Sequence, residues 1–346
     1  MIKVSVLGAT GYAGAELVRI LCSHPEVELG YLGSSSFAGK PMSSVYNNFR
    51  KVLDKELSDA DAAEIAKNSD LVFTALPHGV SKTVIPALYE QGVKVIDLSG
   101  DYRYDDPEVY AEWYGEPHNN VELMKKAVYS LCELHREKIK NADIVANPGC
   151  YTTCSILGSA PLYASKVVRP GSIIIDADSG VTGAGRSTAL DNSFCECTEN
   201  MKAYKAIGHR HTSEIEQELS KLCGEKVVAT FTPHLVPLKR GILATIHADL
   251  VKDISEDELI ALYREYYKDE YFVRIYGKNE LPETNHVAGS NFVDIAVRKD
   301  ERTNRVLVIS CIDNIVKGAA GQAVQNMNLM FGFDEKCGLA NPGFYL

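Results

Sequence analysis

The stretch Ile2-Lys-Val-Ser-Val-Leu-Gly-Ala-Thr-Gly-Tyr-Ala-Gly14 decides the fold class. It joins a short apolar strand, residues 2–7, to a helix over 13–22 in which apolar residues recur at helical spacing. The glycines at 8, 11 and 14 let the backbone turn tightly and approach a diphosphate at the start of the helix. A strand, a glycine-rich turn and a helix in this order predict a dinucleotide site, with a turn that binds nothing as the alternative.

Strand-like and helical segments alternate along the rest of the first half. Helical patterns at 60–67 and 80–91 separate apolar runs that fit buried strands, which lie at 27–32, 71–76, 93–98 and 143–146. Strands that alternate with helices predict an α/β fold with a Rossmann-type parallel sheet.

The pattern changes after residue 150, where strand-like runs lie closer together, at 172–178, 226–233, 241–250, 291–298 and 305–312. Ser213 with Glu216, and Ser255 with Glu258, have the spacing of capping boxes and predict two helix starts. A last helix is predicted over 318–331. We therefore expect an α+β arrangement with a mixed sheet in this part.

The chain is long enough for two domains. It has 346 residues, 45% of them apolar, and a domain averages roughly 150 residues. We assign residues 1–149 to a Rossmann domain that binds the dinucleotide, and 150–314 to a catalytic and oligomerisation domain. We expect the C-terminal segment, 315–346, to complete the first domain with its helix.

Charge and cysteine content exclude several classes of protein. The chain has 36 basic and 46 acidic residues, a net charge of −10, whereas proteins that bind nucleic acid or anionic membranes usually carry a basic face. Glu16 and Arg19 interrupt the only N-terminal run that resembles a signal peptide, and no apolar run approaches the ~18 residues of a membrane helix. Nine cysteines at irregular spacing do not fit a secreted disulfide scaffold, so we expect a reducing cytoplasm.

The end of the second strand indicates which dinucleotide is bound. An NAD site usually has an acidic residue there, which binds the ribose 2′-hydroxyl. Residues 31–36 instead read Tyr-Leu-Gly-Ser-Ser-Ser, and Lys40 follows. Hydroxyl groups and a lysine suit a 2′-phosphate, so we predict NADP, with an ordinary polar loop as the alternative.

Cys150 is the candidate nucleophile. The segment Asn147-Pro-Gly-Cys150 follows the strand at 143–146 and is predicted to open a helix. The positive end of a helix dipole favours a thiolate at that position. Cys154 lies one turn deeper and is expected to pack as a small apolar residue.

A second cluster of candidate residues precedes the helix that Ser213 starts. Gly208-His-Arg-His211 brings two histidines and an arginine together, which suits proton transfer and anion binding. A zinc site made of Cys195, Cys197, His209 and His211 is the alternative, although the usual Cys-x-x-Cys spacing is missing.

Two loops rich in small residues follow strands in the second half. Successive N–H groups in 178–186 can form an anion nest, with Arg186 adding charge, and a loop that binds nothing is the alternative. The segment 313–321 joins the last strand to the closing helix, and its small residues permit either close packing or the close approach of a cofactor.

Together these segments resemble the N-acetyl-γ-glutamyl-phosphate reductases, within the wider aspartate-semialdehyde dehydrogenase-like group. The matching motifs span nearly the whole chain: GATGYAG at 8–14, LPHG at 76–79, DLSGDYR at 97–103, NPGCY at 147–151, SGVTGAGR at 179–186, GHRHTSEI at 208–215, FTPHLVPLKRGIL at 231–243 and DNIVKGAAGQAVQNMN at 313–328. The chain departs from the family pattern at Ser130, Cys132, Thr152, Thr182 and Ser213.

The resemblance implies an NADP-dependent oxidoreductase of arginine biosynthesis. Such an enzyme reduces N-acetyl-L-glutamyl 5-phosphate to N-acetyl-L-glutamate 5-semialdehyde and releases phosphate, through a thioester on Cys150 with His209 as acid and base. The implied cofactor-binding residues are Gly8, Thr10, Gly11, Tyr12, Ala13, Gly14, Ser34, Ser35, Ser36, Lys40, Pro77 and Asn314. The candidate substrate-binding residues are Arg103, Asn147, Ser179, Gly180, Arg186, Arg210 and Arg240.

The expected partners are this small acyl phosphate and further copies of the chain, in a homodimer or homotetramer, with no metal, nucleic acid or membrane. Two other interpretations stay open. One is a sibling reductase that acts on aspartyl phosphate or an aminoadipate analogue. The other, from a different class, is a non-catalytic dinucleotide sensor.

Overall fold

The computed structural model describes residues 1–186 and 189–345, which form two compact units. Unit 1 comprises Met1–Gly149 and Ala319–Ala340, and unit 2 comprises Cys150–Gly318 and the chain from Asn341 onward. We expected all of 315–346 in the first domain, but its first four residues and its tail belong to unit 2. The tail is held there because the Phe344 N–H donates to the Ala288 carbonyl at 3.0 Å.

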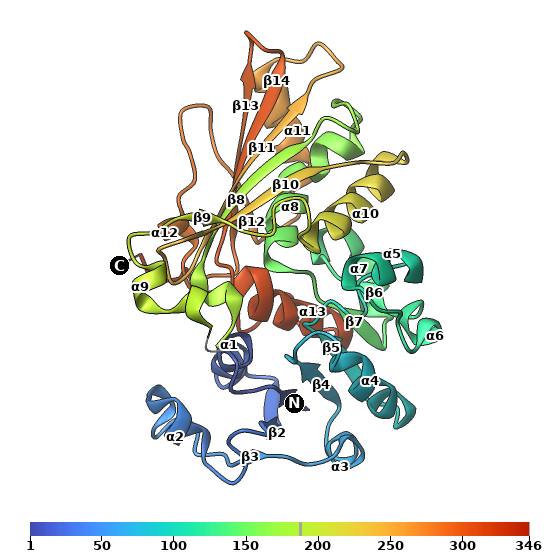
Figure 1. The fold of residues 1–346 in the computed structure, drawn as a ribbon, viewed down its shortest axis with the longest axis vertical. Coiled ribbons are helices and arrows are strands. Elements are labelled where there is room, and N and C mark those ends of the chain that lie inside the picture. The colour runs from blue at the N-terminus through green and yellow to red at the C-terminus, as the bar shows by residue number, and fades with distance from the viewer. Residues whose placement is uncertain (187–188, 346) are drawn as a thin grey trace. The chain divides into compact units, whose positions relative to one another are not determined.

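Unit 1 is built on a sheet in which every strand pair is parallel. Its order is β3-β2-β1-β4-β5-β7-β6 (Figure 1). The strands are β1 Ile2–Leu7, β2 Val27–Gly33, β3 Leu57–Ser58, β4 Leu71–Thr74, β5 Lys94–Asp97, β6 Val128–Tyr129 and β7 Ile144–Ala146. The predicted Rossmann-type parallel sheet is therefore confirmed.

Helices on this sheet bury its apolar side chains. Residues of α3, α4 and α5 form one core with Val72 of β4 and Val95 of β5. Elsewhere in the unit, α13 packs against α1 and α7. The helices are α1 Tyr12–Leu21, α2 Met42–Val45, α3 Ala62–Lys67, α4 Ser81–Glu90, α5 Pro107–Tyr114, α6 Val121–Met124, α7 Cys132–Lys140 and α13 Gly321–Phe331. A π-helical turn, Val316–Ala320, leads into α13.

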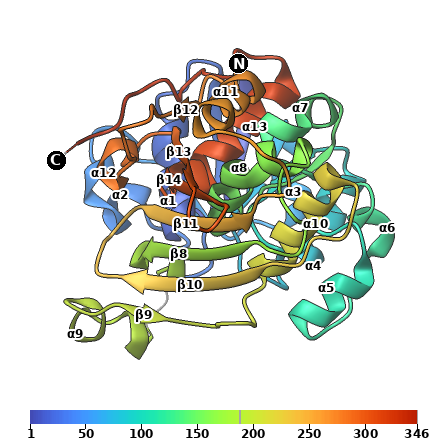
Figure 2. The ribbon, with the colours of Figure 1, turned by 90° about the horizontal axis from the view of Figure 1, so that it is seen from above.

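Unit 2 contains a mixed sheet, as predicted, in the order β12-β13-β14-β11-β8-β10-β9. The pairs β8–β10 and β12–β13 are parallel and the others are antiparallel. The strands are β8 Ile174–Gly180, β9 Lys202–Ala203, β10 Thr230–Val236, β11 Ile242–Asp249, β12 Val273–Ile275, β13 Val293–Asp300 and β14 Arg305–Ile312. Figure 2 shows β9 at the edge of the sheet, beyond β10.

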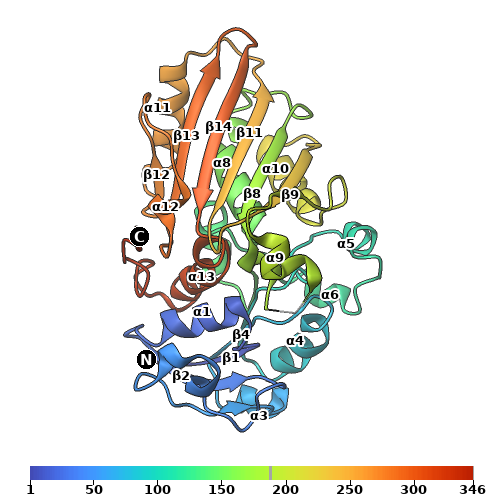
Figure 3. The ribbon, with the colours of Figure 1, turned by 60° about the vertical axis from the view of Figure 1, so that its left-hand side comes forward.

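One face of this sheet carries the long helices of unit 2. α8 packs against β11 and β14, α10 packs against α8, and α11 packs against β13. In Figure 3, α8 lies behind β11 and β14, and no described helix lies over the face of these strands that is turned to the viewer. The helices are α8 Cys150–Ala164, α9 Phe194–Cys197, α10 His211–Cys223, α11 Glu256–Tyr266 and α12 Thr284–Val287.

Helix α8, which begins at Cys150, is buried from Tyr151 to Tyr163. It contains Pro161, which has no N–H to donate to the carbonyl of Leu157. The hydroxyl of Tyr267 donates to that carbonyl at 2.6 Å. The proline is therefore tolerated inside a buried helix because a side chain replaces the missing donor.

Of the two predicted capping boxes, one is confirmed and one is wrong. Ser255 accepts the Glu258 N–H, and Glu258 accepts the Ser255 N–H, at the start of α11. Ser213, by contrast, lies inside α10, which begins two residues earlier at His211. Its hydroxyl donates to the Arg210 carbonyl at 2.9 Å, and the N-cap position of the helix is Arg210.

Candidate active site

Two close backbone approaches shape the glycine-rich turn between β1 and α1. Gly8 has φ +80°, and a Cβ atom there would lie 2.2 Å from the carbonyl oxygen of Ala75. A Cβ atom on Gly14 would lie 2.1 Å from the oxygen of Gly8. At Gly11 the nearest atom would be 3.5 Å away, and no described side chain caps α1. The first-turn N–H groups of α1, which have no acceptor within the helix, can therefore bind an anion.

The loop after β2 lies beside this turn. The hydroxyls of Thr10 and Ser34 are 2.9 Å apart, and the Tyr46 hydroxyl donates to the Thr10 carbonyl at 3.0 Å. The other predicted cofactor-binding residues of unit 1 are exposed except for half-buried Ala13: Tyr12, Ser35, Ser36, Lys40 and Pro77. The glycine-rich turn and the loop after β2, both predicted to bind the cofactor, thus lie side by side. Residues 31–36 include no acidic side chain that could bind a ribose 2′-hydroxyl.

Cys150 is the first residue of α8, as predicted, and is partly exposed. A Cβ atom on Gly318 would lie 2.7 Å from the Cβ and 3.1 Å from the Cα of Cys150, so this approach requires glycine. Cys154 is fully buried and lies 3.2 Å from the Ser310 carbonyl. Burial raises the pKa of the Cys154 thiol to about 12. Cys154 therefore stays protonated and packs as an apolar residue.

His209 is surrounded by three aromatic rings, an arrangement that the sequence did not predict. The ring centroids of Tyr151, Tyr204 and Phe231 are each within 5.6 Å of its own. The Nδ1 of His209 accepts the His211 N–H at 3.2 Å, which fixes the ring. Because Tyr151 directly follows Cys150, this contact brings the segment of His209 to the start of α8. Tyr204 gave no signal beyond its position five residues before His209.

The two tyrosines are linked to each other and to β10. The Tyr204 hydroxyl donates to the Tyr151 hydroxyl at 3.2 Å, and the latter donates to the His234 carbonyl at 2.9 Å. Burial raises the pKa of both tyrosines above the ordinary value. Both hydroxyls therefore remain protonated, and their hydrogen bonds hold the two rings beside His209.

Asn314 joins the loops that follow β8 and β10. Its Oδ1 accepts the Gly241 N–H at 2.8 Å, and its Nδ2 donates to the Thr182 hydroxyl at 3.0 Å. The side chain is buried. Beside it, Gly180 approaches the backbone of Lys239 and Arg240 so closely that a Cβ atom would come within 2.8 Å. The predicted residues Gly180, Arg240 and Asn314 therefore belong to one packed cluster, with buried Ser179 next to them.

The four candidate arginines have different surroundings. Arg103 is buried in unit 1, where its Nε donates to the Asn147 carbonyl at 2.8 Å and its NH2 group donates to the Leu98 carbonyl at 2.9 Å. In unit 2, Arg240 pairs with buried Asp313 at 3.4 Å. Arg210 is half-buried and Arg186 is exposed. Which of them contact substrate stays a prediction.

The alternative of a zinc site has no support in the geometry. Among the described residues, no group of three or more His, Cys, Asp or Glu side chains is arranged to hold a metal ion. Cys197 lies 3.2 Å from the Asp191 carbonyl, and Cys195 is exposed. No helix in the described part of the chain is long and apolar enough to cross a membrane.

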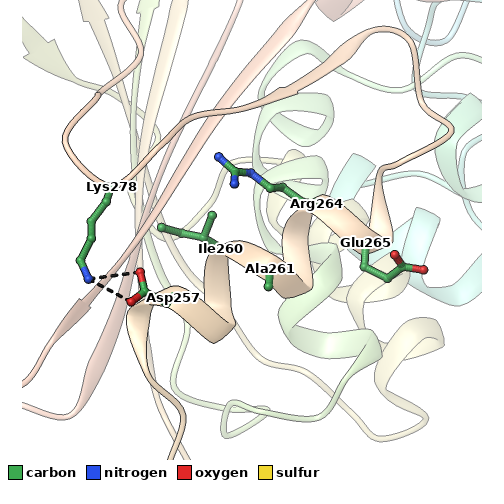
Figure 4. A pocket seen from close by; sticks show the side chains of 6 residues that line it. All are labelled: Asp257, Ile260, Ala261, Arg264, Glu265 and Lys278. Carbon is green, nitrogen blue, oxygen red and sulfur yellow. Dashed lines mark hydrogen bonds and ion pairs between the residues drawn. The ribbon is translucent and has the colours of Figure 1, made fainter.

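A hollow on the surface of α11 is separate from these residues. Figure 4 shows its lining, in which Asp257 pairs with Lys278 at 3.1 Å. The lining residues are Asp257, Ile260, Ala261, Arg264, Glu265 and Lys278, and none of them is a predicted site residue.

Comparison with known proteins places these features in a family. Residues 3–142 match the semialdehyde dehydrogenase NAD binding domain, and residues 150–314 match the semialdehyde dehydrogenase dimerisation domain. An N-acetyl-gamma-glutamyl-phosphate reductase of Acetivibrio thermocellus is 55% identical over the whole of both chains. Another, of Halothermothrix orenii, is 50% identical over the whole of both chains.

The chain belongs to the N-acetyl-gamma-glutamyl-phosphate reductase family. The resemblance drawn from the motifs is thereby confirmed, and so is the prediction of an enzyme. The fold also matches the crystal structure of an aspartate semialdehyde dehydrogenase with NADP from Candida albicans. That match has a TM-score of 0.73 at 16% identity and covers 96% of this chain and 98% of the other. The chain and that structure therefore share one α/β architecture.

Proposed function

We propose that the protein uses NADPH to reduce N-acetyl-L-glutamyl 5-phosphate to N-acetyl-L-glutamate 5-semialdehyde, with release of phosphate. The observation that carries this proposal is the 55% identity, over the whole chain, to a relative named for that reaction. Cys150 at the first position of a buried helix supplies the nucleophile that the reaction needs.

The residues of unit 1 fit a dinucleotide. The diphosphate would lie against the turn at Gly8, Gly11 and Gly14, where a Cβ atom on the first or last glycine would collide with backbone. The 2′-phosphate would lie near Ser34, with exposed hydroxyls and Lys40 as further donors. When bound, NADPH supplies the hydride that brings the acyl carbon to the aldehyde level.

The thiolate of Cys150 attacks the acyl carbon of the substrate. A carbon–sulfur bond forms, the bond from carbon to the phosphate oxygen breaks, and phosphate leaves with the electron pair. The first N–H groups of α8 stabilise the oxyanion that develops on the carbonyl oxygen. His209 holds the proton that this oxygen takes up, and accepts it again as the aldehyde forms and the Cys150 thiolate leaves.

The substrate carries a phosphate and a carboxylate, so the site needs cationic groups and N–H donors. We assign this role to the cluster around Gly180 and Arg240, with Arg186 and Arg210 as further cations. The ion pair of half-buried Arg240 with buried Asp313 supports this assignment because it orients the guanidinium group. Arg103, Asn147 and Ser179 remain candidates for contacts with substrate.

The proposal is tested with Cys150→Ser and His209→Asn, assayed for phosphate-dependent reduction of NADP by the semialdehyde. We expect Cys150→Ser to abolish turnover and to leave NADPH binding unchanged. His209→Asn should lower turnover far more than the control His211→Asn. Near-native activity of Cys150→Ser would refute the thioester route. Turnover of aspartate semialdehyde alone would identify the sibling reductase, and tight NADPH binding without any turnover would identify a dinucleotide sensor.

We also propose that the protein is a homodimer or homotetramer that assembles through the open face of the sheet in unit 2. The match of residues 150–314 to a dimerisation domain supports this proposal. Side chains on that face are only half-buried, including the pairs Thr245–Ile309 and His247–Leu307 of β11 and β14. Ile309→Lys should lower the mass found by sedimentation, and an unchanged mass would place the interface elsewhere.

We place the enzyme in the cytoplasm, where its thiols stay reduced. The nine cysteines are thiols and form no disulfide with one another, and the chemistry requires Cys150 as a thiolate.

A further inference from the structure

Asn147, three residues before Cys150, is held by hydrogen bonds at each of its polar groups. Its N–H donates to the Asp97 carbonyl at 2.8 Å, and its carbonyl accepts the Nε of Arg103 at 2.8 Å. Its Nδ2 donates to the Ala319 carbonyl at 3.2 Å, and its Oδ1 accepts the Nδ2 of Asn326 at 3.0 Å. Because the residue is 1% exposed, water cannot replace these partners.

Asn326, in the middle of α13, also forms hydrogen bonds with Ser130 and Cys132. Its Nδ2 donates to the Ser130 hydroxyl at 2.8 Å, and that hydroxyl donates to the carbonyl of Ala146 at 3.0 Å. Its Oδ1 accepts the thiol of Cys132 at 2.9 Å. With 0% exposure and partners for both ends of the amide, the side chain has a single orientation.

The link from Asn147 to Cys150 is short, and a proline restricts its first part. Only Pro148 and Gly149 intervene, and a proline fixes its own φ angle and restricts the residue before it. Gly318 also lies so close to Cys150 that a Cβ atom on it would overlap the Cα and Cβ atoms of Cys150. A displacement of Asn147 therefore moves the first residue of α8 instead of being absorbed by a flexible loop.

We propose that Asn326 is a positioning residue for the nucleophile: through Asn147 it fixes where the Pro148-Gly149 link delivers Cys150. This inference rests on the proposed role of Cys150, and it assigns a catalytic consequence to a side chain 176 residues further along the chain. Asn326 itself takes no part in the chemistry. Without its amide, the Asn147 oxygen and the Ser130 hydroxyl lose a buried partner and must find others by moving.

The variants Asn326→Ala and Asn326→Asp test the proposal, with Asn328→Ala as the matched control. Asn328 lies on the same helix and is equally buried, and its Nδ2 donates to the Glu335 and Cys337 carbonyls. Substitution at either position is therefore expected to lower the free energy of unfolding. Of the two side chains, Asn326 is the one that donates a hydrogen bond to Asn147. We expect kcat of the Asn326 variants to fall about 10- to 100-fold with little change in KM, and kcat of Asn328→Ala to stay at the wild-type level.

A second measurement does not depend on turnover. The rate at which iodoacetamide alkylates Cys150, followed by peptide mass spectrometry across pH, reports the surroundings of the thiol, with exposed Cys195 as the reference in the same molecule. We expect the Cys150 profile to shift in the Asn326 variants and not in Asn328→Ala, while the Cys195 profile stays unchanged.

Equal losses of kcat in the Asn326 and Asn328 variants, or a Cys150 alkylation profile unchanged in Asn326→Asp, would overturn the proposal. If Asn326→Ala does not fold, Ser130→Ala removes the hydroxyl that accepts a hydrogen bond from Asn326. This variant should shift the pH profile of Cys150 alkylation in the direction seen for Asn326→Asp. The experiments distinguish failure of the proposed function from failure of the positioning role of Asn326. Wild-type protein inactive on the acyl phosphate refutes the proposed function, whereas the alkylation comparison still decides whether Asn326 positions Cys150.

Discussion

Gly318→Ala is the most direct perturbation of the close approach between the π-helical turn and Cys150, the proposed nucleophile. The added methyl group would lie 2.7 Å from the Cβ of Cys150, about 0.7 Å closer than the 3.4 Å at which ordinary contacts begin. It would also lie 3.1 Å from the Cα of Cys150 and 3.3 Å from the Cδ1 of Ile312. Rotation of a side chain cannot relieve this overlap, because the Cα and Cβ atoms of Cys150 move only with the backbone.

The overlap predicts losses of both stability and turnover. Overpacking of this size costs about 1–3 kcal/mol of unfolding free energy, and a shift of ~1 Å in a reacting group lowers the rate by up to ~100-fold. Urea unfolding measures the first quantity, and kcat per folded enzyme measures the second. Gly171→Ala is the control, because a Cβ atom there has no described neighbour within 4 Å, and it should be neutral or stabilising by about 0.4–1 kcal/mol. Wild-type kcat in Gly318→Ala would refute the argument that this contact sets the position of Cys150.

Two further predictions concern stability. Tyr267→Phe leaves the buried Leu157 carbonyl without its donor, so urea unfolding should show a loss of about 1–3 kcal/mol; a loss as small as that of the control Tyr266→Phe would contradict this. Burial lowers the pKa of His24 below its ordinary value, so the folded state binds a proton there less readily than the unfolded state. The contribution of neutral His24 to the free energy of unfolding is complete above about pH 6.5. It is lost as the pH falls through that value towards the pKa of the folded state. His24→Gln should flatten the pH dependence of the urea midpoint between pH 7 and 5, and an unchanged slope would assign the dependence to another group.

Local patterns in the sequence were sufficient for much of the fold. The glycine-rich turn and the start of α8 at Cys150 follow from residues adjacent in the chain, because helix starts and tight turns depend on near neighbours. Ser213 shows the limit of such patterns. It has a glutamate three residues later, yet α10 begins at His211, and the Ser213 hydroxyl bonds back to Arg210.

Long-range partners explain what the sequence could not provide. Strands β3, β6 and β9 have only two residues each and exist because a neighbouring strand pairs with them. Arg103 has the composition of an anion-binding residue, but its bonds to two backbone carbonyls depend on the ends of β5 and β7 lying together. In the sequence, Asn326 is one of several polar residues in the helix predicted over 318–331. Its role could not be predicted because its hydrogen-bond partners lie up to 196 residues away in the chain.

The division of unit 1 into two stretches of chain affects how the protein is made. A ribosome synthesises the seven parallel strands first and delivers α13 only after some 170 further residues have been added. Until then the nascent sheet lacks a helix in which ten residues, Gly321 to Met330, are buried in the finished protein. Apolar surface that waits this long is a target for chaperones and for aggregation. Expression of residues 1–149 alone would make that intermediate permanent, whereas a circular permutant that begins near residue 319 would supply the helix first.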